Sequence, residues 1–158
     1  MTVEFRLAGP DDEPFLTEML RLAMGWRDGS RPPLTAQTAA YVRGFGARDG
    51  DRGVVAFRGA APVGAAWYRR FAAADATYGF VRDDVPELSL AVDPGARRLG
   101  VATGLLTRLI AEACEQGLAG MSLSVEPDNA ARSLYERLGF AKVGERAGAW
   151  TMVRALGA

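Results

Sequence analysis

The stretch Glu87–Leu106, ELSLAVDPGARRLGVATGLL, decides how this chain folds. It opens with Glu87–Val92, a short and mainly apolar run that is typical of a strand. A Pro94-Gly95 turn and a basic, glycine-containing bend follow. From Val101 onward, apolar residues recur every four positions, which is typical of a helix that faces a core. The stretch therefore predicts a strand, a turn and a helix in direct succession.

The turn into this helix is suited to binding a phosphate, and it reads Arg97-x-x-Gly100-x-Ala102. The first turn of a helix leaves backbone N–H groups unpaired and carries partial positive charge. Gly100 and Ala102 add little bulk, so the backbone can approach a ligand closely. Arg97 and Arg98 add two positive charges beside it. The turn therefore predicts a site for a phosphate-bearing ligand.

This turn has two other interpretations. An ordinary helix start with an exposed arginine pair stays open. Dinucleotide or nucleoside triphosphate binding is not supported, because no G-x-G-x-x-G sequence follows a strand and no Walker sequence is present.

The composition excludes several classes of function. Lys and Arg together number 19, as do Asp and Glu, so the chain has no net charge and does not resemble a general nucleic-acid binder. It contains no histidine, which removes histidine general bases, His-based triads and His metal sites. The single cysteine, Cys114, excludes an intrachain disulfide and is expected to pack as a small apolar side chain beside a helix stripe.

The length and hydropathy predict one domain over residues 1–158. The N-terminus lacks a charged region followed by an apolar run, so no signal peptide is expected. No window approaches 18 uncharged apolar residues, so no membrane span is expected. We therefore expect a cytoplasmic protein with neither a membrane nor a nucleic acid as partner.

The remaining elements follow from hydrophobic periodicity and turn residues. Strands are expected at residues 3–7, 51–58, 62–71, 87–92 and 121–125, with a final hairpin around 143 and 150–153. Helices are expected after a cap at Asp11 or Asp12, at about 35–45, from 101 to a stop at Gly117, and from a cap at Asp128 or Asn129 to Gly139. Residues 25–33 and 72–84 are expected to be loops.

Two segments carry a resemblance to a known family. Arg97, Gly100 and Ala102 match the Gln/Arg-x-x-Gly-x-Gly/Ala pattern of the acetyl-CoA-binding motif of the GNAT N-acetyltransferases. Downstream, Asn129–Phe140, NAARSLYERLGF, resembles that family's second hallmark. The resemblance covers nearly the whole chain. It implies a single-domain α/β (α+β) fold, whose central sheet is mixed, mostly antiparallel and of about seven strands, with about four helices.

The resemblance also implies how acetyl-CoA would be held, without a metal. Backbone groups at the end of one strand would pair with the pantetheine arm, and the amides of the following turn would bind the pyrophosphate. Asn129 would contact CoA, although Asp128 competes for that position and a helix cap is an equal alternative. The residues implied in cofactor binding are Leu90, Ala91, Val92, Arg97, Arg98, Leu99, Gly100, Val101, Ala102, Thr103 and Asn129.

Two residues match catalytic positions of the family. Tyr135 would face the CoA sulfur as general acid, with core packing as the alternative role. Glu87 would act as general base, usually through a water, with a merely solvated carboxylate as the alternative. Weaker candidates for the base are Asp83, Asp84 and Glu126.

Family geometry places the acceptor amine between the loop 25–33, the region of Trp67 and Tyr68, and the final hairpin. Trp26, Arg27, Trp67 and Tyr68 are the expected substrate residues, with Trp67 or Tyr68 turned into the core. The expected reaction is acetyl transfer to a primary amine of a small molecule. A protein N-terminus or lysine as acceptor, and a non-catalytic CoA-binding sensor or interaction module, are the alternatives. A homodimer is left open.

Overall fold

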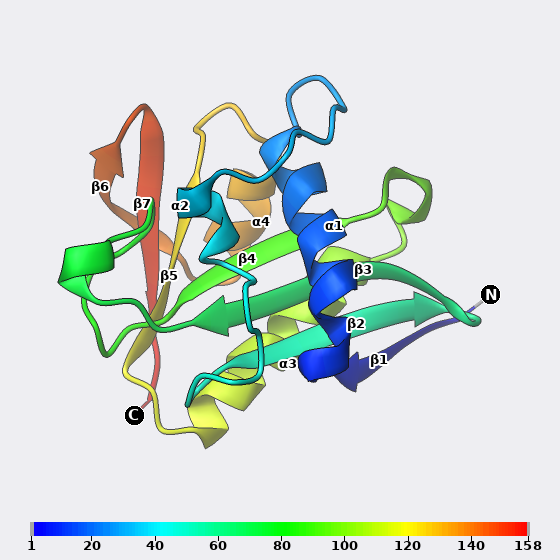
Figure 1. The fold of residues 1–158 in the computed structure, drawn as a ribbon, viewed down its shortest axis with the longest axis horizontal. Helices are drawn as coiled ribbons and strands as arrows, with labels where there is room; N and C mark the ends of the chain where they lie inside the picture. Colours follow the sequence, from blue (N-terminus) through cyan, green and yellow to red (C-terminus); the bar gives the residue numbers. More distant parts are fainter. Residues whose placement is uncertain (1, 158) are drawn as a thin grey trace. The chain divides into compact units, whose positions relative to one another are not determined.

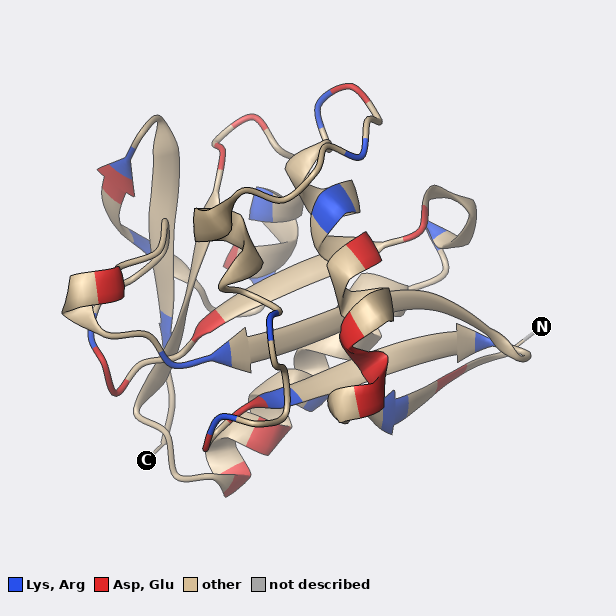
Figure 2. Cartoon of the chain, in the orientation of Figure 1, with Lys and Arg blue, Asp and Glu red and all other residues tan. Residues whose placement is uncertain are grey.

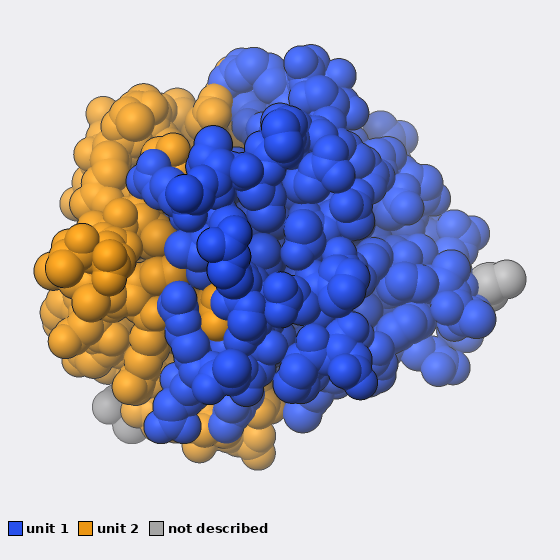
Figure 3. All heavy atoms as spheres, in the orientation of Figure 1, with its two compact units in different colours: residues 1–68, 89–109 blue, residues 69–88, 110–158 orange. Residues whose placement is uncertain are grey.

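A computed structural model of the chain describes residues 2–157. The chain divides into two compact units, drawn in two colours in Figure 3. The first unit comprises Met1–Tyr68 and Ser89–Leu109, and the second comprises Arg69–Leu88 and Ile110–Ala158. Strand β4 (Glu87–Val92) and helix α3 (Val101–Glu115) each contribute residues to both units.

The first unit is built on an antiparallel β-meander. Strand β1 (Val3–Leu7) pairs with β2 (Arg52–Arg58), which pairs with β3 (Ala61–Arg69), and β4 is next in the strand order. Strands β2 and β3 are buried on both faces along most of their length, which is why they read as near-continuous apolar runs. Helix α1 (Glu13–Met24) lies in front of these strands in Figure 1, and α3 lies behind them.

Helix α3 approaches β1 closely because a glycine lies at the contact. A Cβ placed on Gly104 would lie 2.4 Å from Cζ of Phe5. The guanidinium of Arg108, one turn later, lies 3.8 Å from the centroid of the same ring. The ring of Phe5 therefore fills the space that a side chain at position 104 would need.

The second unit continues the sheet order through β4, β5 (Gly120–Val125), β7 (Ala149–Ala155) and β6 (Ala141–Arg146). Strands β4 and β5 run parallel, with Glu87 opposite Ser122, whereas the β5–β7 and β7–β6 pairs are antiparallel. Helix α4 (Ala131–Arg137) follows β5, and Gly139, which has a φ of 96°, comes two residues after its last residue. Its buried side chains are Leu134 and Tyr135.

The predicted fold class is confirmed, as is the order of elements. Over the described residues, seven strands form one mixed sheet, and there are four α-helices. The second helix is shorter than expected. Helix α2 spans only Ala36–Ala39, after a capping hydrogen bond from the Thr38 amide to the Thr35 hydroxyl. Gly44 and Gly46, both with positive φ, lie in the turns that follow it.

The expected caps differ in detail. Asp12 directly precedes α1, but its carboxylate accepts hydrogen bonds from Arg6 and from the Gly9 amide, and makes no side-chain cap of α1. Asn129 lies one residue before the cap position of α4, and its side-chain oxygen accepts a hydrogen bond from the Ala131 amide at 2.9 Å.

Two expectations about burial were wrong. Cys114 is exposed, because it lies one position beyond the buried Ala113 and points away from the apolar stripe of α3. Trp67 and Tyr68 are both buried, although alternation along a strand predicted only one of them in the core. Their strand β3 is covered on both faces, so successive side chains are buried alike.

Charges of both signs are interspersed, as α1 and the loop after it show in Figure 2. In the described part of the chain, no helix is long and apolar enough to cross a membrane. Among the same residues, no group of three or more Cys, Asp or Glu side chains is arranged to hold a metal ion.

Candidate active site

The turn after β4 is pinned to the first unit at its start. The amide of Asp93 donates to the Val63 carbonyl at 2.7 Å, and the Asp93 carboxylate accepts a hydrogen bond from the Gly95 amide at 3.1 Å. Pro94–Ala96 forms a short 3-10 turn that ends on the buried Ala96. The chain therefore leaves the strand along a fixed path into the exposed segment that follows.

That segment, residues 97–100, is exposed and carries two residues in the left-handed region. Arg98 has a φ of 66° and Gly100 a φ of 75°. A non-glycine residue in this region costs about 1–2 kcal/mol and is uncommon outside turns and functional sites. A Cβ added to Gly100 would meet nothing within 4 Å, so the space beside this residue is open.

The first amides of α3 follow directly on Gly100. The first backbone hydrogen bond of the helix runs from Gly104 N to Gly100 O at 3.0 Å. The amides of Val101, Ala102 and Thr103 therefore have no acceptor within the helix. With Arg97 and Arg98 beside them, they form the kind of helix start that binds a phosphate.

The three strand residues expected to meet the pantetheine arm belong to the same unit as this turn. Ala91 is buried, whereas Leu90 and Val92 are half-buried. The first unit thus holds every residue expected to bind acetyl-CoA except Asn129, which is in the second unit.

Glu87 is buried rather than solvated, with 3% of its surface exposed. One carboxylate oxygen accepts a hydrogen bond from the Thr77 hydroxyl, and the other accepts one from the Gly79 amide at 3.1 Å. Ser122 is opposite Glu87 in the sheet, so both side chains lie on one face. The Ser122 hydroxyl is buried and has no hydrogen-bond partner among the described residues.

Tyr135 is also buried, in α4, and its ring packs edge-on against Phe140 with centroids 5.7 Å apart. Burial raises the pKa of its phenol, and no charged or hydrogen-bonding neighbour contributes to that rise. The phenol is therefore a neutral O–H group and a weaker acid than an exposed tyrosine.

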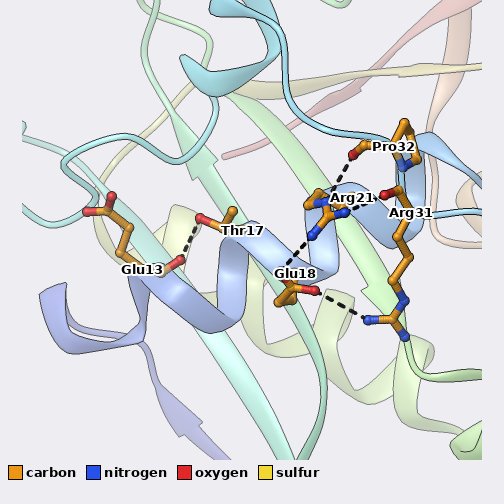
Figure 4. Close-up of polar contacts among 6 residues, drawn as sticks. All are labelled: Glu13, Thr17, Glu18, Arg21, Arg31 and Pro32. Atoms are coloured by element: carbon orange, nitrogen blue, oxygen red, sulfur yellow. Dashed lines mark hydrogen bonds and ion pairs between the residues drawn. The ribbon is translucent and has the colours of Figure 1, made fainter.

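The expected acceptor loop, residues 25–33, is held to α1 by arginine, as Figure 4 shows. Nε of Arg21 donates to the Pro32 carbonyl at 3.0 Å, and its terminal nitrogens reach the Arg31 carbonyl and Glu18. Glu18 also lies 3.7 Å from the Arg31 guanidinium. The loop is thus tied back onto the helix that it leaves.

The four expected substrate residues have different environments. Trp26 is half-buried, and the exposed Arg27 stacks over its ring at 4.5 Å. The indole N–H of Trp67 donates to the Tyr41 carbonyl at 2.9 Å, which gives Trp67 a structural role in the core. Tyr68, next in β3, is buried as well. Of the four, only Trp26 and Arg27 expose surface to a ligand.

Within the final hairpin, Trp150 is flanked by two cations. Arg132 lies 4.8 Å from the centroid of its ring and Lys142 lies 4.6 Å from it. Arg132 belongs to α4, so this stack connects the tyrosine-bearing helix to strand β7.

Sequence reasoning missed two residues that hold Glu87 and a third that binds one of them. Thr77 and Gly79 lie in the weakly patterned segment before β4, and Arg146 at the end of β6 donates to the Thr77 carbonyl. The only local indication was a glycine in an irregular stretch, which alone does not predict a contact.

A model described as the acetyltransferase (GNAT) family matches residues 15–140. The matched range includes the turn at residues 97–103, Glu87, Asn129 and Tyr135.

One curated relative is the [ribosomal protein bS18]-alanine N-acetyltransferase of Escherichia coli strain K12. It is 43% identical over 61 residues, which are 38% of this chain and only 41% of that protein.

The crystal structure of the ribosomal-protein-S18-alanine N-acetyltransferase from Escherichia coli has a TM-score of 0.71, at 22% identity, and the match covers 99% of this chain and 96% of that one. The structure of yncA from Salmonella typhimurium with its cofactor acetyl-CoA has a TM-score of 0.73, at 24% identity, over 100% and 96% of the two chains.

Proposed function

Because this chain belongs to the acetyltransferase (GNAT) family, we propose that it transfers the acetyl group of acetyl-CoA directly to a primary amine. The observation that carries the proposal is the exposed segment 97–100 with its open space at Gly100, followed by helix amides at residues 101–103 that have no acceptor within the helix. A pyrophosphate is the ligand that this combination of amides and two arginines suits.

In the proposed reaction, the amine nitrogen attacks the thioester carbonyl carbon. The amine proton passes to a base, and the tetrahedral intermediate collapses by breaking the carbon–sulfur bond. The departing thiolate takes a proton from the Tyr135 phenol, which solvent later returns. The position of Tyr135 in the segment Asn129–Phe140, which resembles the family's second hallmark and lies within the matched range, supports this role.

Glu87 is our proposed base, acting through a water. Direct contact with a substrate is not supported, because the side chain is buried and both carboxylate oxygens accept hydrogen bonds. The neighbouring Ser122 hydroxyl, buried and without a partner among described residues, supports a polar path for a water on the same face of the sheet.

The acceptor is proposed to be a small amine that contacts Trp26 and Arg27, the two expected substrate residues that expose surface. A protein N-terminus is the second candidate, because the curated relative is named for acetylating an alanine of a ribosomal protein. That match spans under half of the relative's length, so its substrate is not carried over.

The test is an assay of acetyl-CoA with a panel of small amines and short peptides. We expect free CoA to appear in equal amount to an N-acetylated product identified by mass spectrometry. Acetylation confined to peptide N-termini would show that the acceptor is a peptide N-terminus and not a small amine. Tight CoA binding with no product from any amine would favour a non-catalytic binding module and overturn the proposal.

A further inference from the structure

The carboxylate of Glu87, in β4, is held by the turn Thr77–Phe80, which precedes this strand in the second unit. Thr77, 2% exposed, donates its hydroxyl hydrogen to one oxygen of this carboxylate. The Thr77 carbonyl accepts a hydrogen bond from the Phe80 amide at 3.3 Å, which closes a four-residue turn. The same carbonyl accepts a hydrogen bond from the guanidinium of Arg146.

Gly79 completes the turn and holds the other carboxylate oxygen. Its amide donates to Oε2 of Glu87 at 3.1 Å. A Cβ at this position would lie 2.7 Å from the Leu123 carbonyl carbon and 2.9 Å from the Ser124 amide nitrogen, so the turn lies directly against the backbone of β5. The turn therefore cannot slide along β5 without losing its contacts.

We propose that Thr77 is a positioning residue for Glu87, and that Arg146 fixes Thr77 in turn. The proposal rests on the proposed role of Glu87 as base. A base must be held within a few tenths of an ångström of its working geometry, by neighbours whose own rotamers are locked. Thr77 meets that requirement because its hydroxyl is bound to Glu87 and its carbonyl to Arg146.

Arg146 binds the backbone carbonyl of Thr77, whereas the hydroxyl of the same residue donates to a negative oxygen of Glu87. The guanidinium therefore fixes the backbone of Thr77, and the hydroxyl makes a charge-assisted hydrogen bond. A hydrogen bond to a charged group contributes more free energy than one between neutral groups. Losing the Thr77 hydroxyl should therefore have a measurable effect on a reaction that uses the charge of Glu87.

A purely structural role for Thr77 makes different predictions. The turn would then only cover the sheet, and its variants would lower stability without a specific effect on turnover. The two roles are separated by comparing kcat with KM, by conservative rescue, and by coupling to Glu87.

The experiment measures kcat, the KM for acetyl-CoA and thermal stability in five variants. Thr77→Val removes the hydroxyl at nearly constant volume, and Thr77→Ser restores it. Glu87→Gln and the double variant T77V/E87Q measure coupling. Thr107→Val, on the exposed face of α3, is the matched control for the substitution itself.

We expect Thr77→Val to lower kcat about 10- to 100-fold, as the loss of a hydrogen bond to a charged group implies, with the KM for acetyl-CoA unchanged. Thr77→Ser should recover most of the rate, and T77V should cost nothing further in the E87Q background. A folded T77V variant with wild-type kcat, or additive losses in the double variant, would overturn the inference. If E87Q alone leaves kcat unchanged, the base role in the proposed function fails instead.

Discussion

The amide of Gly79 donates to the Glu87 carboxylate at 3.1 Å, and only a glycine fits where it does so. A Cβ there would lie 2.9 Å from Oε2 of Glu87 and 2.7 Å from the Leu123 carbonyl carbon. Since β5 cannot yield, Gly79→Ala should lower the free energy of unfolding by about 1–3 kcal/mol, measured by urea denaturation.

Gly144→Ala is the matched control for that prediction. Gly144 lies in β6 of the same unit, and a Cβ there would meet nothing within 4 Å. We expect its unfolding free energy to stay within about 0.5 kcal/mol of wild type. Equal losses of unfolding free energy in the two variants would mean that the close approach of Gly79 to β5 does not affect stability.

Tyr135→Phe should lower turnover and leave CoA affinity nearly unchanged. The phenol acts only as the thiolate departs, and general acids typically contribute ~10²–10⁴-fold in rate. Rapid-quench kinetics should measure the chemical step directly, with Tyr41→Phe as a control for removing a buried phenol hydroxyl. An unaltered chemical step would assign Tyr135 to packing against Phe140 alone.

Glu87→Gln should reduce the rate most at low pH. An alkylamine substrate is mostly protonated at pH 7, so a base is needed until the free amine becomes abundant at higher pH. Activity of the variant should therefore recover as pH rises, relative to wild type and to Glu136→Gln on the exposed side of α4. Parallel pH–rate profiles would transfer the role to Asp83, Asp84, Glu126 or solvent.

Asp12→Asn should destabilise the protein at neutral pH but not in acid. The Arg6 guanidinium, hydrogen-bonded to Asp12 at 2.7 and 2.8 Å, lowers the pKa of that carboxyl below its ordinary value of 3.8. A lowered pKa stabilises the fold above the ordinary value, and the effect is lost as pH falls through the lowered pKa.

The measurement is the melting temperature of wild type and variant between pH 2 and 7. The difference should be constant above about pH 5 and vanish toward pH 2, with Asp11→Asn showing no such trend. A melting-temperature difference that persists unchanged to pH 2 would show that the lowered pKa of Asp12 makes no contribution to stability.

The order of elements could be predicted from the sequence because it depends on local patterns. The apolar residues of α3 recur with a helical period, and Gly117 and Gly139 follow α3 and α4 with positive φ as expected. The buried runs of β2 and β5 likewise read as strands.

The surroundings of Glu87 could not be predicted, because they come from distant positions. Arg146 lies 69 residues from Thr77, and no local pattern marks either residue as a partner of the other. The segment that includes Thr77 and Gly79 has no regular strand or helix period, so no local pattern predicts its hydrogen bonds to Glu87 or its close contact with β5. The burial of Cys114 was predicted wrongly, because the helix turns from core to solvent between two successive residues. Ala113 is buried, whereas Cys114 is exposed.

The central claim is that the amides of the turn from Arg97 to Thr103 bind the pyrophosphate of acetyl-CoA. Isothermal titration calorimetry with CoA tests it directly in Gly100→Glu, which places a carboxylate and bulk beside those amides. Gly117→Glu is a close control, because Gly117 has a φ of 72° against 75° for Gly100, and a Cβ at either position would meet nothing within 4 Å.

Both substitutions should impose a similar backbone strain, so any difference in affinity reports on the site. We predict that wild type and Gly117→Glu bind CoA alike, and that Gly100→Glu, folded by circular dichroism, binds at least about 10-fold more weakly, since like charges repel and the approach is blocked. Equal CoA affinity in all three proteins would contradict the account.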